Sequence, residues 1–224
     1  MNKANPPILN APKIVSLLLG ANFVVFVIKS LAPYDFEYWL LQHFAFAAAP
    51  YMEPGAWLSS PVYLLHAPVT YMFLHVDFIH LAMNMAMLLA FGTVIARRMG
   101  SSTYLIFYLI CGVVSAAAWV LFNPGSTSPV IGASGAISGM FGAVGRLSLR
   151  TPRLGVQPFQ YFSRRTALSF VLLWIVLNFV FGALGGAVFG VDAEIAWEAH
   201  LGGFVAGYLL IGLFDGKGLQ ATTP

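Results

Sequence analysis

Residues 99–145 read MGSSTYLIFYLICGVVSAAAWVLFNPGSTSPVIGASGAISGMFGAVG and contain no Lys, Arg, Asp or Glu. A helix needs about 20 mostly apolar residues to cross the hydrocarbon core of a bilayer, so this run is too long for one span. The segment Asn123-Pro124-Gly125, followed by Ser-Thr-Ser-Pro, is typical of a turn. The stretch therefore predicts two membrane helices, at 103–122 and 130–145, of which the second is short and rich in glycine.

The composition of the whole chain also indicates a membrane protein. Of its 224 residues, 59% are hydrophobic and 8% are charged, whereas soluble domains carry about 25% charged residues. Further apolar runs predict four more spans, at 14–31, 78–96, 166–184 and 195–214. We therefore expect an all-α polytopic membrane protein, a bundle of six transmembrane helices that forms a single domain over residues 1–224.

The distribution of positive charge predicts the orientation of this bundle, because Lys and Arg concentrate in cytoplasmic loops. With the N-terminus inside, ten of the eleven Lys and Arg residues fall on the inner side, and only Lys29 lies near the outer face. Both termini are therefore predicted to be cytoplasmic. The ten inner residues are Lys3, Lys13, Arg97, Arg98, Arg146, Arg150, Arg153, Arg164, Arg165 and Lys217.

The first outer loop, residues 33–67, is longer and more apolar than a simple connector. It includes Trp39 and Trp57, and tryptophan favours the headgroup region of a bilayer. We expect this segment to be membrane-associated, lying on or partly in the outer leaflet. The alternative is a packed structural loop.

Polar side chains occur at a similar depth in three of the predicted spans. His80 and Asn84 are four residues apart and share one face of the second helix. Ser134 begins the fourth span, and His200 lies about five residues into the sixth, roughly 8 Å below the surface. Polar groups inside a membrane are costly, so they are functional candidates. The alternative is structural hydrogen bonding between helices, which is the role favoured for Asn178 of the fifth span.

A G-x-x-x-G pattern follows each of two of these polar residues, Ser134 and His200. Small residues at this spacing let two membrane helices approach closely. If these two helix faces pack together, the serine and the histidine come within hydrogen-bond range. The patterns are Gly135/Gly139 and Gly203/Gly207, and together with Gly132 these glycines are assigned to structural support of the site.

These residue types fit nucleophilic catalysis. A serine hydroxyl needs an adjacent base, and a histidine near neutrality fits that role, so we interpret Ser134 and His200 as a catalytic dyad. The backbone N–H groups near Ser134 lie at a helix N-terminus, where donors face a developing negative charge. The His80 and Asn84 side chains are candidates for further donors. Glu198 points to a different helix face from His200, which favours a dyad over a triad.

With these motifs in this order, the sequence resembles the rhomboid intramembrane serine proteases. The resemblance covers nearly the whole chain, from residue 14 to 214. The pieces that carry it are Phe73-Leu74-His75, His80-Leu81, Asn84-Met85, Gly132-Ala133-Ser134-Gly135, Ala199-His200-Leu201-Gly202-Gly203 and Gly207.

The resemblance implies roles for individual residues. Ser134 would be the nucleophile and His200 the general base and acid, with His80, Asn84 and the Ser134 N–H forming the oxyanion hole. His75 would support the site structurally. The family uses no metal or organic cofactor and cleaves transmembrane protein substrates near the outer membrane face. As a weaker hypothesis, the fifth span would move aside to admit substrate.

The sequence departs from the family pattern at two places. Many members carry an aromatic residue four positions after the serine, stacked on the histidine, where this chain has Ser138. First loops of the family often carry a Trp-Arg pair, but residues 33–67 contain no arginine. Neither difference removes a catalytic atom.

Other classes of function remain as alternatives. One is a non-catalytic rhomboid-like protein that binds membrane clients, although such proteins usually lose the serine or the histidine. A second alternative is a transporter or metal channel that uses His75, His80 and His200. A third is a zinc protease, but the His-Glu-x-x-His pattern typical of that class is absent from the sequence. The arginines at 146–165 are a topology signal, so no nucleic-acid partner is expected. The first span lacks a cleavage site for a signal peptide, and the chain lacks a transit peptide, which favours a bacterial plasma membrane.

Overall fold

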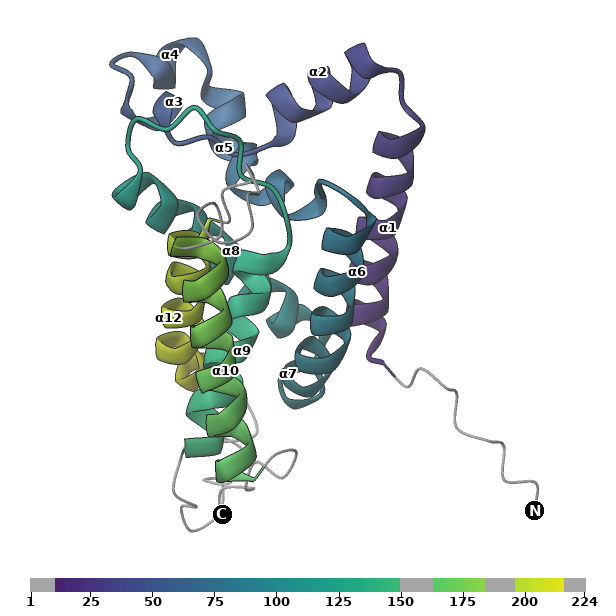
Figure 1. The fold of residues 1–224 in the computed structure, drawn as a ribbon, viewed down its shortest axis with the longest axis vertical. Coiled ribbons are helices and arrows are strands. Elements are labelled where there is room, and N and C mark those ends of the chain that lie inside the picture. The colour runs from purple at the N-terminus through teal and green to yellow at the C-terminus, as the bar shows by residue number, and fades with distance from the viewer. Residues whose placement is uncertain (1–10, 150–162, 184–195, 216–224) are drawn as a thin grey trace, which may run out of the picture.

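The computed structural model describes residues 11–149, 163–183 and 196–215. Within these ranges the regular structure is helical, and the only β pairing is an isolated antiparallel bridge between Phe46 and Val130. Figure 1 shows long helices packed side by side, with short helices gathered at one end of the bundle. The long helices are α1 (Lys13–Leu31), α8 (Ser101–Phe122), α9 (Ser134–Leu149), α10 (Arg164–Ala183) and α12 (Trp197–Phe214). A further long helix is continuous from α6 (Phe78–Met87) through the π-helix η2 (Leu88–Gly92) to α7 (Thr93–Met99).

Four helices in the described ranges are long and apolar enough to cross a membrane. They are α1, the continuous unit Phe78–Met99 formed by α6, η2 and α7, α8, and α12. The chain is therefore an integral membrane protein with several spans. The helices α9 and α10 occupy the positions predicted for the fourth and fifth spans, and the count of six spans stays a prediction.

Several predicted boundaries were wrong by a few residues. The fourth helix was predicted at 130–145 but begins at Ser134 and continues to Leu149. Two causes delay its start: Val130 exchanges backbone hydrogen bonds with Phe46, at 3.0 and 2.7 Å, and Gly132 has a φ of +124°, outside the helical region. The second span continues to Met99, where Gly100 with a φ of +84° ends it.

The other predicted helices differ from prediction only at their ends. The third helix begins at Ser101 and the fifth at Arg164, slightly before their predicted starts. The sixth begins at Trp197 because Ala196 has a non-helical ψ of 68°. The predicted terminal positions 184 and 195 lie outside the described residues.

The predicted outer loop is largely helical. Its elements are α2 (Tyr34–Phe44), α3 (Ala49–Met52), α4 (Ala56–Ser59), α5 (Pro61–Thr70) and the 3₁₀ turn η1 (Tyr71–Phe73). Trp39, Trp57 and Leu58 are exposed in this segment, the last at 90%. Exposed aromatic and aliphatic side chains suit contact with lipid headgroups, and the membrane association of this segment stays a prediction.

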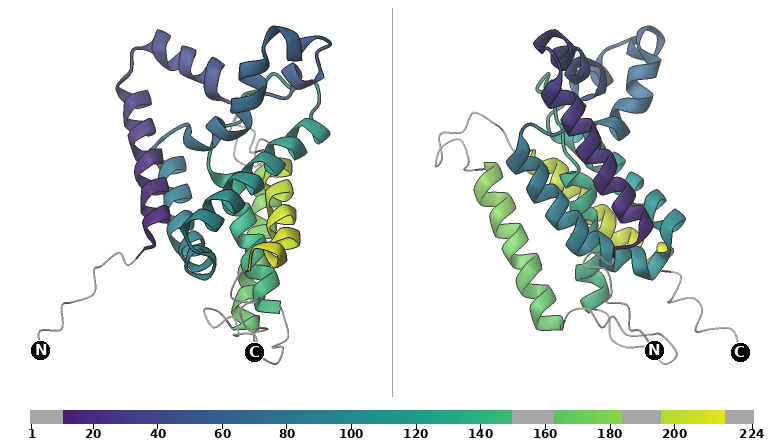
Figure 2. Two further views of the ribbon diagram at one scale, coloured as in Figure 1. Left: turned by 180° about the vertical axis from the view of Figure 1, so that it is seen from behind. Right: turned by 90° about the vertical axis from the view of Figure 1, so that its right-hand side faces the viewer.

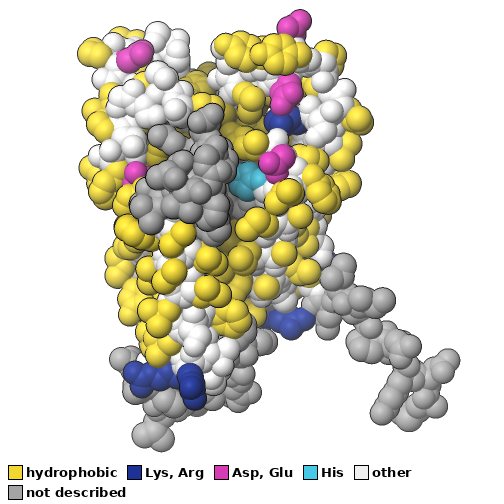
Figure 3. All heavy atoms as spheres, in the orientation of Figure 1, with side chains coloured by type: hydrophobic (Ala, Val, Ile, Leu, Met, Phe, Trp, Pro, Cys, Tyr) yellow, Lys and Arg dark blue, Asp and Glu magenta, His cyan; other side chains and the backbone are white. Residues whose placement is uncertain are grey.

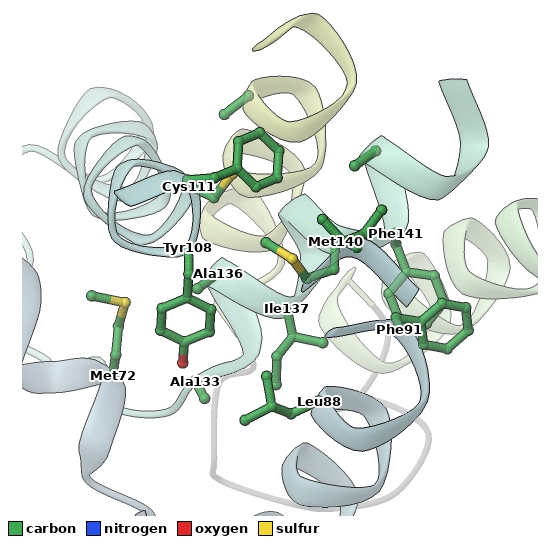
Figure 4. Packing of buried hydrophobic residues seen from close by; sticks show 14 of the residues in the cluster. Met72, Leu88, Phe91, Tyr108, Cys111, Ala133, Ala136, Ile137, Met140 and Phe141 are labelled. Carbon is green, nitrogen blue, oxygen red and sulfur yellow. The ribbon is translucent and has the colours of Figure 1, made fainter. Parts of the chain in front are cut away.

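Helix α9 lies at the centre of the packed core. Figure 4 shows its residues Ala136, Ile137 and Met140 lying between Tyr108 and Cys111 on one side and Leu88 and Phe91 on the other. Most of the residues of α9 are buried. A helix that is apolar or small on all faces is expected to be surrounded by other helices, and this places the start of α9 inside the bundle.

The surface of the bundle separates apolar from charged side chains. In the view of Figure 3 the middle of the molecule is mostly hydrophobic, while Lys and Arg side chains gather mainly at the lower end. The helix ends that carry Lys13, Arg97, Arg98, Arg164 and Arg165 lie together at this end (Figure 1). An apolar belt between polar ends is the pattern expected of a membrane-spanning bundle.

A buried ion pair joins two elements at that same end. Arg98, in the last turn of α7, donates from Nε to Asp215 Oδ1 at 2.6 Å and from Nη2 to Oδ2 at 2.8 Å. The side chains of Arg98 and Asp215 are 8% and 1% exposed. This two-pronged contact ties the end of the second span to the residue that follows α12.

The predicted glycine contact between α9 and α12 is very close. A Cβ atom at Gly207 would overlap the carbonyl oxygen of Gly139, and one at Gly203 would overlap the carbonyl oxygen of Gly135. Because both obstacles are backbone atoms, no side-chain rotation can relieve the overlap. The two helices can therefore approach this closely only with glycine at these positions.

We expect Gly207→Ala to destabilise the folded protein by about 1–3 kcal/mol, because the methyl group forces α9 and α12 apart. Thermal unfolding in detergent measures the effect. The matched control is Gly20→Ala in α1, where an added Cβ meets nothing within 4 Å. Both substitutions raise helix propensity equally, so equal unfolding temperatures for the two variants would contradict the packing argument.

Candidate active site

Ser134 is the first residue of α9 and follows a segment that is fixed by backbone hydrogen bonds. Gly132, two residues earlier, donates its N–H to the carbonyl oxygen of Tyr71 at 2.9 Å. This bond and the bridge between Phe46 and Val130 hold the segment that leads into the helix. The serine side chain is thus presented at a helix N-terminus, where N–H groups lack partners in a preceding turn.

His200 lies in the first turn of α12, and its ring reaches the serine of α9. His200 Nε2 and Ser134 Oγ are 2.7 Å apart, a hydrogen-bond distance between residues 66 positions apart in sequence. Both groups are partly buried. The structure therefore brings together the two residues predicted to form the dyad.

His80 faces the turn before Ser134. The carboxylate of Asp77 caps α6 by accepting the His80 N–H at 2.7 Å, which sets where this helix begins. His80 Nδ1 accepts the N–H of Val76 at 3.5 Å, so Nε2 carries the ring proton. A Cβ at Gly132 would lie 2.9 Å from His80 Nε2, which shows how closely this donor approaches the backbone beside the serine.

Asn84 occupies the same helix face as His80, one turn further along. Its side-chain amide donates to the carbonyl oxygen of His80 at 2.9 Å. The side chain is 5% exposed. This bond uses one of the two amide hydrogens, and the second N–H of Asn84 remains a candidate oxyanion donor.

His75 lies in the loop that precedes α6. The residue is fully buried, and its ring lies edge-on to that of His80, with centroids 5.1 Å apart. Burial, assisted by the neighbouring His80, lowers the pKa of His75 to about 4, so this ring is neutral at physiological pH. Lys29 reaches the same loop, donating to the carbonyl oxygen of Val76 at 3.2 Å and pairing with Glu37 at 2.7 Å.

One contact of the histidine was missed by the sequence analysis. Asn178 of α10 places its Oδ1 atom 2.7 Å from His200 Nδ1. The sequence analysis assigned this asparagine only to helix–helix bonding, which it also makes, since its Nδ2 donates to the Trp197 carbonyl oxygen at 3.3 Å. The sequence feature that could have identified Asn178 as a functional candidate is a single side-chain amide within an otherwise apolar predicted span.

Ser138, the position where many relatives carry an aromatic residue, is buried within α9 at 2% exposure. Aromatic stacking in this part of the bundle instead links Phe141, Trp174 and Phe204. These rings join α9, α10 and α12. Among the described residues, no group of three or more His, Cys, Asp or Glu side chains is arranged to hold a metal ion.

The fold and the site together define a helical membrane protein in which a serine and a histidine meet between two closely packed helices. A family model described as the Rhomboid domain matches residues 65–216. The chain belongs to the rhomboid family. The match does not include α1, although the resemblance was expected to extend to residue 14.

Similar proteins come from bacteria and from plants. Rhomboid protease GluP of Bacillus subtilis is 32% identical over 135 residues, covering 60% of this chain and 23% of that protein. RHOMBOID-like protein 5 of Arabidopsis thaliana is 30% identical over 142 residues, covering 63% and 41%. Rhomboid protease GlpG of Yersinia pestis is 26% identical over 142 residues, covering 63% and 45%. The matched region is less than half the length of each of these relatives.

Proposed function

We propose that this protein is an intramembrane serine endopeptidase that cleaves transmembrane segments of other membrane proteins near the outer membrane face. The observation that carries the proposal is the 2.7 Å contact between Ser134 Oγ and His200 Nε2. Membership of a family with relatives named rhomboid proteases supports the same activity. No metal or organic cofactor is needed for this chemistry.

The proposed reaction proceeds through an acyl-enzyme. His200 Nε2 accepts the hydroxyl proton while Ser134 Oγ attacks the peptide carbonyl carbon, and the resulting imidazolium then protonates the leaving amine. Water, deprotonated by His200, then attacks the ester, and the imidazolium returns this proton to Ser134 Oγ as the bond to the acyl group breaks and the carboxylic acid product leaves. The oxyanion is stabilised by the Ser134 N–H, by His80 Nε2–H and by the amide hydrogen of Asn84 that does not bind the His80 carbonyl oxygen.

The proposed topology has six spans in one membrane domain over residues 1–224, with both termini cytoplasmic. The gathering of Lys and Arg at one end of the bundle supports this orientation. Ser134 begins its helix at the opposite end from Arg146 of the same helix. The site then lies in the outer half of the membrane, and a bacterial plasma membrane is the proposed location.

Substrate is proposed to approach beside α10. This helix lies at the edge of the bundle in Figure 2. Many of its apolar side chains are exposed, among them Leu172, Leu173, Val176 and Phe179. A helical substrate must unwind before attack, and unpaired backbone is costly in lipid, so cleavage is expected near the membrane boundary.

The direct test uses purified protein in proteoliposomes, a labelled single-span substrate and a fluorophosphonate that reacts with activated serines. We expect cleavage, labelling that mass spectrometry maps to Ser134, and no effect of a metal chelator. Substrate binding without cleavage or labelling would instead identify a non-catalytic client-binding protein. Cleavage that a chelator stops and Ser134→Ala does not would identify a metalloprotease.

Gly132→Ala is expected to lower cleavage by about 10²-fold, because misplacing a reacting group by roughly 1 Å has an effect of this size. The added Cβ would lie 2.8 Å from His80 Cε1 and 3.5 Å from Ser134 Oγ. Initial cleavage rates in proteoliposomes measure the loss.

The matched control for this variant is Gly55→Ala. Gly55 also has a positive φ, of +82°, but an added Cβ there meets nothing within 4 Å. Gly55→Ala therefore places an alanine at a positive φ, as Gly132→Ala does, but its Cβ does not overlap His80 or any other group. Equal loss of activity in the two variants would show that strain, and not displacement of His80, causes the defect.

A further inference from the structure

Asn178 contacts the proposed base from the side opposite the nucleophile. Its Oδ1 atom lies 2.7 Å from His200 Nδ1, and Ser134 Oγ lies 2.7 Å from His200 Nε2. The three side chains come from α10, α12 and α9, so they form a continuous chain of hydrogen bonds across three helices. All three side chains belong to partly buried residues.

The second contact of Asn178 determines which way its amide faces. Its other terminal atom lies 3.3 Å from the Trp197 carbonyl oxygen, and a carbonyl oxygen can only accept a hydrogen bond. The NH₂ group must therefore face Trp197, which leaves the amide oxygen facing the imidazole of His200. The carbonyl oxygen of Trp197 thus fixes the orientation of the Asn178 amide. The distance to His200 alone would not distinguish the amide oxygen from the amide nitrogen.

The orientation of the amide then determines the tautomer of His200. An amide oxygen also only accepts, so His200 Nδ1 must carry the hydrogen. In the neutral ring Nε2 is then without a hydrogen and accepts the Ser134 hydroxyl proton. This is the tautomer that a general base for serine requires.

We infer that Asn178 is a positioning residue for catalysis, which fixes the tautomer and ring plane of His200; this inference rests on the proposed protease function. The residue touches neither substrate nor reacting atoms and acts through the histidine. Its neutral amide supplies the acceptor without placing a carboxylate inside the membrane, which would be costly. The ring of His200 is thereby oriented by a hydrogen bond from Nδ1–H to the amide oxygen of Asn178.

The competing role for Asn178 is purely structural, a link between α10 and α12 through the Trp197 carbonyl oxygen. The two roles use different atoms of the amide: positioning uses Oδ1, and the structural link uses Nδ2. Asn178→Asp keeps an acceptor for His200 and removes the donor to Trp197. Asn178→Leu, of similar size, removes both.

The experiment compares kcat and KM of wild type, Asn178→Asp and Asn178→Leu for one membrane substrate, together with the rate of fluorophosphonate labelling. For Asn178→Leu we expect kcat to fall by about 10²-fold while KM stays within about twofold, since ground-state binding is unaffected. Labelling should slow in parallel. Asn178→Asp should recover most of the lost kcat.

The control variant is Leu213→Ala, which shortens a 75% exposed side chain near the far end of α12 and should leave kcat unchanged. Equal kcat for wild type and Asn178→Leu would overturn the inference. Loss of kcat in Asn178→Asp equal to that in Asn178→Leu would also overturn it in favour of the structural link. Failure of the proposed function is distinct, because then the wild type itself neither cleaves nor becomes labelled.

Discussion

Ser134→Ala should lower kcat/KM for a membrane substrate by about 10⁴-fold or more, because the nucleophile and the proton it transfers are both lost. His200→Ala should cause a loss of similar size, since the serine hydroxyl is a weak nucleophile without its base. The 2.7 Å contact between the two side chains is the structural reason for expecting one functional unit. Initial rates in proteoliposomes measure both variants.

The double variant, with both Ser134 and His200 replaced by alanine, shows whether the two residues act as one catalytic unit or contribute independently to kcat/KM. If Ser134 and His200 act together, the double variant should be no slower than either single variant, because removing one member already disables the other. Independent contributions would multiply instead, and a multiplied loss would contradict the dyad. Thermal unfolding of all three variants in detergent provides the control for folding, with similar midpoints expected.

Arg98→Met should destabilise the protein by about 3–5 kcal/mol, because it removes the two hydrogen bonds that the guanidinium donates to the buried carboxylate of Asp215. Asp215 is 1% exposed, so water cannot replace the lost hydrogen bonds. Denaturant-induced unfolding in mixed micelles measures the loss. Arg164→Met is the control, since it removes the same charge from an exposed position at the start of α10 and should change stability by less than about 1 kcal/mol.

A double-mutant cycle tests whether the contact itself is responsible. Arg98→Met combined with Asp215→Leu should recover most of the stability lost in Arg98→Met, because two apolar side chains of similar volume replace a buried ion pair at little cost. Equal instability of the single and double variants would assign the effect to the shape of the arginine side chain instead. The pair would then be a minor contributor to the join between α7 and α12.

The main features of the fold were predictable from residue type and spacing. Apolar runs of span length predicted α1, the α6–α7 unit and α8 to within a few residues. The errors came where backbone conformation depends on distant partners, as at Val130, which pairs with Phe46. No local sequence pattern predicts the β-bridge between Val130 and Phe46, because these residues are far apart in the sequence.

The candidate site was predictable to a similar extent. Ser134, His200, His80 and Asn84 stand out because polar side chains are rare inside apolar spans. The role of Asn178 was missed because its partner lies on another helix, and an amide in a membrane helix is more often structural. The hydrogen bond from Asn84 to the His80 carbonyl oxygen also depends on conformation, which spacing alone does not determine.

The sequence by itself determined that this protein is a membrane protein. It also determined the ends of its helices to within a few residues and the polar side chains that those helices carry. These properties follow from local composition, because transfer of each side chain between water and lipid depends mainly on its own chemistry. Only the tertiary structure decided that Ser134, His200 and Asn178 form one hydrogen-bonded chain. That arrangement depends on how closely α9, α10 and α12 pack, and hydrogen bonds form only when distance and direction are both correct.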